Sequence, residues 1–255
     1  MPPIPNKGVR VDNLSVGYDR HPAVAGLSGV FAEASLTAVV GPNGSGKSTL
    51  LKALAGHCKP LAGRVDLSGV RPSEIAYLPQ AHGLDLKFPL TLQDLVGFGF
   101  IGRRGLFGGF RREDRERLRA LMVQVGLEGL ERRPIGSVSG GQLQRALFAR
   151  VMAQDAKLVL LDEPFNGIDA RAAEDLAQLM ARWPDEGRTV IAVLHDLDLV
   201  RRLCPQSLVM ARQAVAWGPT DKAIAPDQLT RARKLAENWN LADEPPVAVL
   251  HQEHV

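Results

Sequence analysis

The sequence predicts an α/β fold, in which buried strands alternate with helices, together with an antiparallel unit and an inserted helical region. Three observations predict this fold. Short apolar runs alternate with segments of helical periodicity from residue 158 onward. The N-terminal residues instead alternate apolar and polar side chains, as antiparallel strands do. Between residues 90 and 154 the strand signals disappear and helical spacing dominates.

The N-terminal part begins with two strands on either side of a polar turn at 19–22. The next strand, at 36–40, is a short apolar run instead of an alternating one, and it leads directly into a glycine-rich loop. The next helix is expected to stop at Gly56, a typical helix-ending residue. In chain order, this part is expected to contain strands at 9–16, 24–31, 36–40, 64–67 and 74–78 and a helix from Ser48 to about Ala55.

The middle of the chain is expected to form a helical subdomain inserted into one core. Leucines, valines and methionines at helical spacing run from Leu92 to Met152, interrupted by a glycine- and aromatic-rich stretch, Gly97 to Phe110. The run Leu158–Leu161 then resumes the core as a buried parallel strand. The remaining expected elements are helices at 170–183, from about 197, and at 226–237, with strands at 189–194 and 207–211. We therefore expect a single domain over 1–255, with its core at 9–89 and 155–218, the helical subdomain at 90–154, and a C-terminal helix and tail at 219–255.

The composition is that of an ordinary globular protein. Hydrophobic residues make up 45% of the 255 residues, yet no apolar run reaches the length that spans a membrane, and no secretory signal is visible. Cys58 and Cys204 match no metal or redox spacing, which favours a reducing cytosol. The arginines between Arg103 and Arg119 are interrupted by acidic residues, so a solvated helix face is favoured over a nucleic-acid groove; a membrane-proximal or phosphate-contacting role is the alternative.

A phosphate-binding loop follows the strand at 36–40. Its residues match the pattern G-x-x-x-x-G-K-[ST] between a strand and a helix. The glycines let backbone N–H groups approach a polyphosphate at a helix N-terminus, while Lys47 can reach its terminal phosphates and Ser48 can ligate Mg²⁺. A chance match is the alternative, expected in roughly one per cent of chains of this length. The loop residues expected to bind nucleotide are Gly41, Pro42, Asn43, Gly44, Ser45, Gly46, Lys47, Ser48 and Thr49.

Two carboxylates follow the strand at 158–161. Asp162 lies at the carboxyl end of a buried strand, where it can hold Mg²⁺ beside the phosphate loop. Glu163, one residue further on, points differently and can polarise a water that attacks the terminal phosphate. An acidic pair that merely caps a helix is the alternative, which the phosphate loop makes less plausible.

A second anion-binding loop precedes these carboxylates. Ser139 is placed as a helix N-cap, and Gly140 and Gly141 leave N–H groups bare at a helix N-terminus. Alone, Ser-Gly-Gly is also a common linker. Its position before the Asp162–Glu163 strand favours a second phosphate contact in the same chain.

In this order the motifs resemble those of the ATP-binding cassette (ABC) ATPases, over roughly residues 9 to 218. The resemblance implies a P-loop NTPase core with an antiparallel β subdomain and an inserted α-helical subdomain. It also implies a role for each matching residue. Around the nucleotide, Tyr18 stacks on adenine, Gln80 senses Mg²⁺ and the attacking water, and His195 contacts the γ-phosphate. Asp162 is the Mg²⁺ carboxylate and Glu163 the general base. Val138 to Gln142, with Ser139, Gly140 and Gly141, form the signature motif, and Asn166 to Asp169 form the subunit-contact loop. The catalytic group is thus Lys47, Gln80, Glu163 and His195, and the Mg²⁺ group is Ser48, Gln80 and Asp162.

The sequence departs from the family pattern at two places. Val138 replaces the usual leucine, which should leave the helix entry intact. Asn166-Gly167-Ile168-Asp169 replaces the more frequent Ser-Ala-Leu-Asp but keeps the aspartate. His195 alone would be read as an ordinary histidine at a helix start, but its position after a core strand favours the switch role.

The resemblance implies an enzyme that hydrolyses ATP with Mg²⁺ and acts as a head-to-tail dimer of two copies. In such a dimer the phosphate loop of one chain faces the signature loop of the other. The implied partners are integral-membrane permease subunits and a solute-binding protein, not nucleic acid, and the implied location is the cytoplasmic face of the inner membrane, as a peripheral subunit. The stretch Gly97 to Phe110, including Phe100 and Phe107, is expected to line the permease contact.

Within the family the chain most resembles the ATPases of bacterial zinc and manganese uptake systems. The resemblance lies in Glu163 to Asp169 and Val193 to Val200. Haem or iron-chelate import is the nearest alternative, and an ABC ATPase that acts on nucleic acid is disfavoured, because the chain has room for only one cassette without long coiled coils. The second anion loop argues against a P-loop kinase or GTPase. The tail His251-Gln252-Glu253-His254 could bind zinc, although an incidental tail is favoured.

Overall fold

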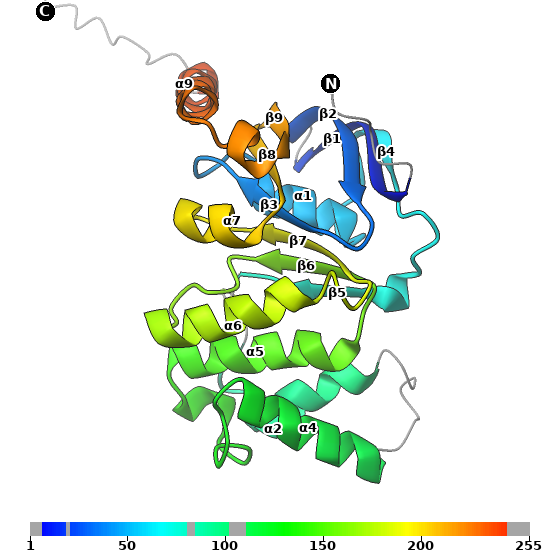
Figure 1. The fold of residues 1–255 in the computed structure, drawn as a ribbon, viewed down its shortest axis with the longest axis vertical. Coiled ribbons are helices and arrows are strands. Elements are labelled where there is room, and N and C mark those ends of the chain that lie inside the picture. The colour runs from blue at the N-terminus through cyan, green and yellow to red at the C-terminus, as the bar shows by residue number, and fades with distance from the viewer. Residues whose placement is uncertain (1–6, 19–20, 81–84, 102–110, 244–255) are drawn as a thin grey trace, which may run out of the picture.

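A central sheet of mainly parallel strands organises the molecule (Figure 1). The computed structural model describes residues 7–18, 21–80, 85–101 and 111–243. Within these ranges the six strands of the sheet lie in the order β5-β6-β7-β3-β8-β9, and only β9 runs antiparallel to its neighbour. Their bounds are β3 (Leu36–Val40), β5 (Ile75–Leu78), β6 (Leu158–Asp162), β7 (Thr189–Val193), β8 (Gln206–Ala211) and β9 (Gln213–Pro219). The predicted α/β class is confirmed.

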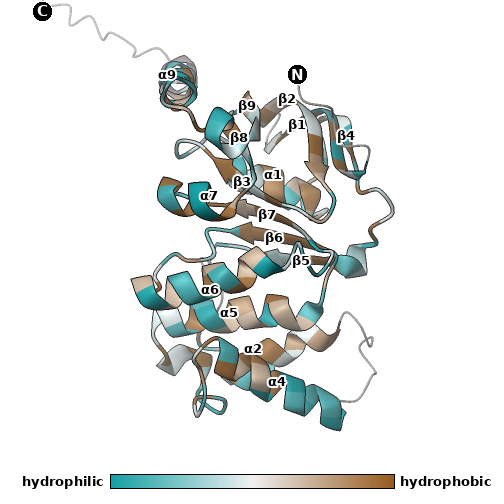
Figure 2. Cartoon of the chain, in the orientation of Figure 1, coloured by the Kyte–Doolittle hydropathy of each residue, from teal (hydrophilic) through white to brown (hydrophobic). Residues whose placement is uncertain are grey.

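The strands at the centre of this sheet are covered on both faces. Every residue of β3, β6 and β7 is buried, which explains why their sequences are mostly apolar rather than alternating; the polar exceptions are Thr37, Asp162 and Thr189. Successive residues nevertheless pack on opposite faces: Leu160 joins one hydrophobic cluster and Leu161 the other. Figure 2 shows these strands as the brown, hydrophobic centre of the molecule, with teal segments on the outer helices.

A separate antiparallel sheet covers one face through helix α1. Its strands are β1 (Gly8–Tyr18), β2 (His21–Ala32) and β4 (Ala62–Asp66), in the order β2-β1-β4. Helix α1 (Lys47–Leu54) lies between this sheet and the central sheet (Figure 1). Its buried Leu50 and Leu54 share a cluster with Phe31 of β2. The predicted helix is confirmed to within one residue, whereas β4 begins two residues earlier than expected.

The helical subdomain packs on the opposite face. It contains α2 (Leu92–Gly97), the short 3-10 segments η2 (Phe98–Phe100) and η3 (Ile135–Ser137), α4 (Arg112–Gln124) and α5 (Gly140–Gln154). Leu95, Met122 and Phe148 from three of these helices join the cluster that also contains Leu161 of β6. The helical region is therefore part of a continuous hydrophobic core, and not an appendage.

The C-terminal elements extend beyond the expected ones. Helices α6 (Ala170–Arg182) and α7 (Leu197–Leu203) follow the predictions closely, whereas β9 and the short α8 (Thr220–Ala223) were not predicted. The 3-10 segment η1 (Pro72–Glu74), which precedes β5 much earlier in the chain, was not predicted either. Helix α9 (Pro226–Asp243) is longer than the expected 226–237. Among the described residues, no helix combines the length and the hydrophobicity that crossing a bilayer requires.

Candidate nucleotide-binding and hydrolysis site

The carboxyl ends of four neighbouring strands bring most of the predicted residues to one edge of the sheet. In the parallel registers Leu78 pairs with Leu161, and Val193 pairs with both Asp162 and Val39. Consequently the segments that follow these strands begin side by side: Gln80 after β5, Glu163 after β6, His195 after β7, and the phosphate loop after β3. This edge is where open α/β sheets bind ligands.

The phosphate loop has the backbone that its glycines predict. Gly44 and Gly46 adopt φ values of 75° and 92°, and a Cβ on Gly46 would lie 2.3 Å from the carbonyl oxygen of Ala23. Only glycine therefore fits at position 46. Lys47 is 6% exposed, and its Nζ donates to the carbonyl oxygens of Gly41 (2.9 Å) and Pro42 (2.8 Å). The ammonium is held within the curve of the loop, where a phosphate would be received.

The environment of Lys47 also sets its charge. Burial lowers the pKa of the amine, against the opposing influence of the carboxylates of Glu163 and Asp162. A buried cation that lacks full compensation attracts an anion strongly, which suits a polyphosphate ligand.

A hydroxyl and a carboxylate suited to Mg²⁺ lie together at the start of α1. Ser48 Oγ donates to Asp162 Oδ1 at 3.1 Å, and Asp162 is only 1% exposed. Burial raises the pKa of Asp162, partly offset by Ser48 and by the charges of Lys47 and Lys52. Hard oxygen donors of this kind are what Mg²⁺ prefers, so the residues fit the ion. When bound with ATP, Mg²⁺ neutralises phosphate charge.

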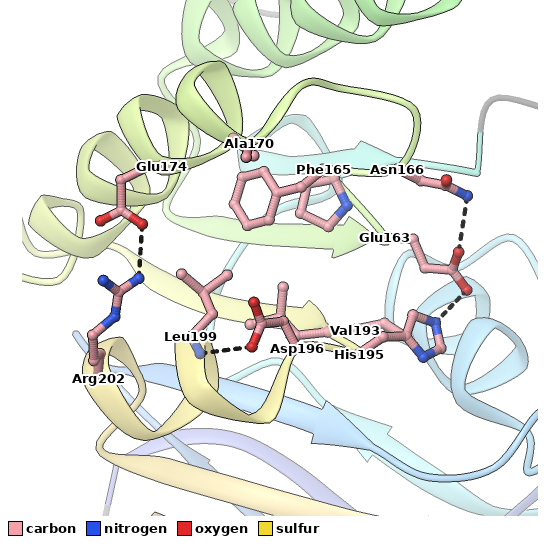
Figure 3. Close-up of a pocket in the computed structure, with 13 residues that line it drawn as sticks. Glu163, Phe165, Asn166, Ala170, Glu174, Val193, His195, Asp196, Leu199 and Arg202 are labelled. Atoms are coloured by element: carbon pink, nitrogen blue, oxygen red, sulfur yellow. Dashed lines mark hydrogen bonds and ion pairs between the residues drawn. The ribbon is translucent and has the colours of Figure 1, made fainter.

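Glu163 is surrounded by hydrogen-bond donors. Its Oε1 accepts from Gln80 Nε2 at 2.7 Å. The same oxygen lies 2.8 Å from His195 Nε2 (Figure 3). Asn166 Nδ2 donates to the other oxygen, Oε2, at 3.3 Å. Gln80 therefore contacts Glu163, the predicted base. Ser48 and Asp162, the other two predicted Mg²⁺ ligands, are hydrogen-bonded to each other. Gln80 stays a predicted Mg²⁺ sensor.

These contacts keep the carboxyl of Glu163 ionised. Burial alone would raise its pKa, but the hydrogen bonds from His195 and Gln80 and the charge of Lys47 outweigh it and hold the pKa below its ordinary value. An ionised carboxylate at neutral pH can accept a proton from water. Glu163 also has φ 51°, an unusual value for a residue with a side chain, so the surrounding structure fixes its backbone.

A cavity of about 490 Å³ opens beside Glu163 and His195. Phe165, Val193 and Leu199 give it an apolar lining, and an ion pair between Arg202 and Glu174, 2.7 Å apart, lies at its other end (Figure 3). The cavity is formed between the starts of α6 and α7.

The second predicted anion loop, residues 139–142, begins helix α5 as expected, but its contacts are separate from those around Lys47 and Glu163. Ser139 caps α5: its Oγ accepts from Gln142 N at 3.2 Å, and Gln142 Oε1 accepts from Ser139 N at 2.9 Å. Gly140 has open space where a Cβ would lie. The contacts that the structure gives for this loop are within itself and to Gly167. Within the described residues, one chain therefore does not bring its two anion loops together.

The remaining predicted residues divide into one that the structure describes and several that it does not. Asp169 caps α6, because its Oδ1 accepts from Ala172 N at 2.9 Å. The backbone of Tyr18 ends β1, but its side chain lies outside the described part of the structure, as do Phe107 and the tail histidines His251 and His254. Among the described residues, no group of three or more histidine, cysteine or acidic side chains could hold a metal.

The expectation that Phe100 lines a membrane partner is wrong. Phe100 is 4% exposed and packs inside the helical subdomain, with the guanidinium of Arg117 5.9 Å from the centre of its ring. The glycine- and aromatic-rich composition indicated an exposed contact, but the 3-10 turn η2 directs this ring into the core. Most of the stretch, residues 102–110, lies outside the described residues.

The sequence reasoning missed Gln144. This glutamine is 2% exposed on α5, and its Nε2 donates to the carbonyl oxygen of Pro164 at 3.0 Å. The available signal was an uncharged polar residue on the apolar face of a helix. Asn166 was predicted only as part of the subunit-contact loop, and its hydrogen bond to Glu163 was not foreseen.

Comparison with known proteins matches this arrangement to one family. The ABC transporter family model matches residues 24–166. A "probable metal transport system ATP-binding protein" of Chlamydia pneumoniae is 38% identical, with 86% of each chain covered. The manganese transport system ATP-binding protein MntB of Halalkalibacterium halodurans is 35% identical, covering 89% of this chain and 92% of MntB. The chelated iron transport system protein YfeB of Yersinia pestis is 35% identical, covering 86% and 76%.

Solved structures agree on the fold. An ABC transporter in an inward-facing conformation matches 90% of this chain and 90% of its own, with a TM-score of 0.77 and 27% identity. The chain belongs to the ABC transporter family of ATP-binding proteins and is an enzyme that hydrolyses ATP.

Proposed function

We propose that this protein is the ATP-hydrolysing subunit that powers the import of a metal ion, manganese or zinc, through a separate membrane permease. The observation that carries the ATPase part is the position of Glu163, with Gln80 and His195 on one carboxylate oxygen, beside the phosphate loop. The cargo is supported by the metal and manganese transport systems to which the relatives belong. Haem or iron-chelate import is the weaker alternative, supported by YfeB.

Each side chain of the site has a proposed task. Lys47 binds the β- and γ-phosphates, and the N–H groups of residues 41–49 surround them. Ser48 and Asp162 hold Mg²⁺, and Gln80 reports its presence. Glu163 accepts a proton from the attacking water, while His195 contacts the γ-phosphate and orients the carboxylate.

The complete site is proposed to need a second copy of the chain. Within the described residues of one chain, no hydrogen bond joins the two anion loops. A head-to-tail pair would place Ser139, Gly140, Gly141 and Gln142 of one copy against the nucleotide held by residues 41–49 of the other. Asp169 would contact the partner copy, and Tyr18 would stack on the adenine. The domain boundaries at residues 90 and 154 stay a prediction, with the inserted helical subdomain carrying the signature loop.

The membrane partner is proposed to contact the exposed apolar side chains around the start of the helical subdomain. Phe88 is 59% exposed and Phe98 44% exposed, and Leu86 and Ile101 are exposed nearby in sequence. A cavity of about 450 Å³ lies beside Phe98 and Ile101. Such side chains suit a protein contact. In the complete system a solute-binding protein would deliver the cargo, and this subunit would lie on the cytoplasmic face of the membrane.

A charge at Phe98 is expected to break the permease contact without breaking the enzyme. Phe98→Glu replaces an exposed ring, so thermal stability and ATPase activity should stay close to wild type while co-purification of the permease is lost. Phe100→Glu is the matched comparison: it introduces a charge into the core and should lower the free energy of unfolding by about 3–5 kcal/mol or more. Normal permease recovery with Phe98→Glu would contradict the proposed surface.

Deletion of the gene tests the cargo. The deletion strain should grow poorly when manganese or zinc is limiting, and recover when the wild-type gene or excess metal is supplied. Growth that fails only on iron chelates or haem would instead support the alternative. Co-purification of this subunit with nucleic acid, and with no membrane protein, would contradict the transport function itself.

A further inference from the structure

We infer that Gln144 is a positioning residue that couples the two ATP sites of the dimer to each other. This inference rests on the proposed head-to-tail function, in which residues 139–142 of a chain meet the partner copy's nucleotide while Glu163 acts on the nucleotide of its own chain. Every chain then contributes to both sites. The coupling must pass through the segment that joins these two contributions inside one chain.

Gln144 forms a buried hydrogen-bonded link between them. It lies on α5 two residues after Gln142, the last residue of the signature loop. Its Nε2 donates to the carbonyl oxygens of Pro164 at 3.0 Å and Glu163 at 3.5 Å. Because both partners can only accept, the amide nitrogen must face them, and its orientation is fixed. The side chain is 2% exposed, and a hydrogen bond in such a place is strengthened by the low dielectric.

Two further contacts place the same face of α5 against residues 163–167. A Cβ built on Gly141 would lie 2.8 Å from the carbonyl oxygen of Gly167, so the two backbones touch. The rings of Phe148 and Phe165 have centroids 6.4 Å apart. Gly141, Gln144 and Phe148 are spaced as one side of a helix, so α5 and the turn after β6 should move as a unit.

The segment after β6, residues 164–167, is also hydrogen-bonded to the catalytic Glu163. Asn166 donates through its backbone N to Glu163 O at 3.2 Å and through Nδ2 to Glu163 Oε2 at 3.3 Å (Figure 3). The backbone of Glu163, at φ 51°, is held in a sparsely populated conformation by its surroundings. A small shift of residues 164–167 therefore rotates the carboxylate. A nucleotide that draws in the signature loop of one chain would reposition Glu163 of that chain, in the other site.

Stability alone does not account for this glutamine. Within the described part of the structure, its Oε1 is buried without a hydrogen-bond partner, which carries a desolvation cost. An apolar side chain of the same shape would avoid that cost. Methionine is such a side chain, so Gln144→Met should leave the fold intact.

The test is the ATP dependence of hydrolysis by Gln144→Met. The wild-type enzyme should show a Hill coefficient approaching about 2, the number of sites in the dimer, and Gln144→Met should lower it to about 1. Its thermal midpoint and the ATP-driven dimerisation of Gln144→Met in a Glu163→Gln background should be unchanged. Gln124→Met, at an exposed glutamine near the end of α4, is the control and should keep the wild-type coefficient.

A second variant covers the case in which Gln144→Met is unstable. Asn166→Ala alters the exposed end of the same connection and should also lower the coefficient, with no further loss in the double variant, because the two residues act in series. A wild-type coefficient in either folded variant would overturn the inference and leave the proposed function intact. A coefficient of about 1 in the wild-type enzyme, with no ATP-driven dimer of Glu163→Gln, would overturn the shared-site function and this inference together.

Discussion

Glu163→Gln is expected to bind ATP normally but to hydrolyse it about a hundred to ten thousand times more slowly than the wild-type enzyme. The amide has nearly the shape of the carboxylate and can still accept from Gln80 Nε2, yet it cannot take a proton from water. ATP should therefore remain at the interface and hold the dimer closed. Nucleotide binding by fluorescence titration, phosphate release and size-exclusion chromatography with ATP measure these three properties separately.

The pH dependence of stability gives an independent check on this variant. The pKa of Glu163 is lower in the folded chain than its ordinary value, so its carboxylate stabilises the fold above the ordinary pKa and loses that contribution as the pH falls through the folded pKa. The free energy of unfolding of Glu163→Gln should lack this acid-dependent contribution. Hydrolysis by Glu163→Gln at the wild-type rate would show that another group is the base.

Lys47→Ala is expected to weaken ATP binding by about a hundredfold, because the phosphates lose a charged hydrogen-bond donor. The folded chain should tolerate the change: burial lowers the pKa of Lys47, so keeping the amine charged opposes folding at neutral pH. The measurement is ATP titration together with thermal unfolding. Lys59→Ala, at an exposed lysine, is the matched control. ATP affinity unchanged in Lys47→Ala would contradict the placement of the phosphates.

The central strands could be predicted from sequence because burial on both faces favours short, mainly apolar runs. Strand β9 could not, because its residues are mostly half-buried or exposed and it is defined by its pairing with β8. Phe100 shows the same limit: its composition suggested a surface, and only the packing of η2 placed it in the core.

The site was predictable wherever chemistry depends on local sequence. The phosphate loop needs its glycines in a fixed order, and Asp162 and Glu163 must follow a buried strand. Asn166 contacts Glu163 only three positions away. The contact of Gln144 with Pro164 instead joins residues twenty positions apart and depends on how α5 packs against the turn after β6. Such a contact has no signature in a single sequence, because a glutamine or an asparagine at these positions has many other possible partners.

The most direct test of a shared ATP site is the specific ATPase activity as a function of protein concentration, with the oligomeric state followed by analytical ultracentrifugation in ATP. Activity per chain should fall on dilution in parallel with the dimer fraction and vanish when only monomer is present. Full activity per chain in a solution that contains monomer alone would contradict the account.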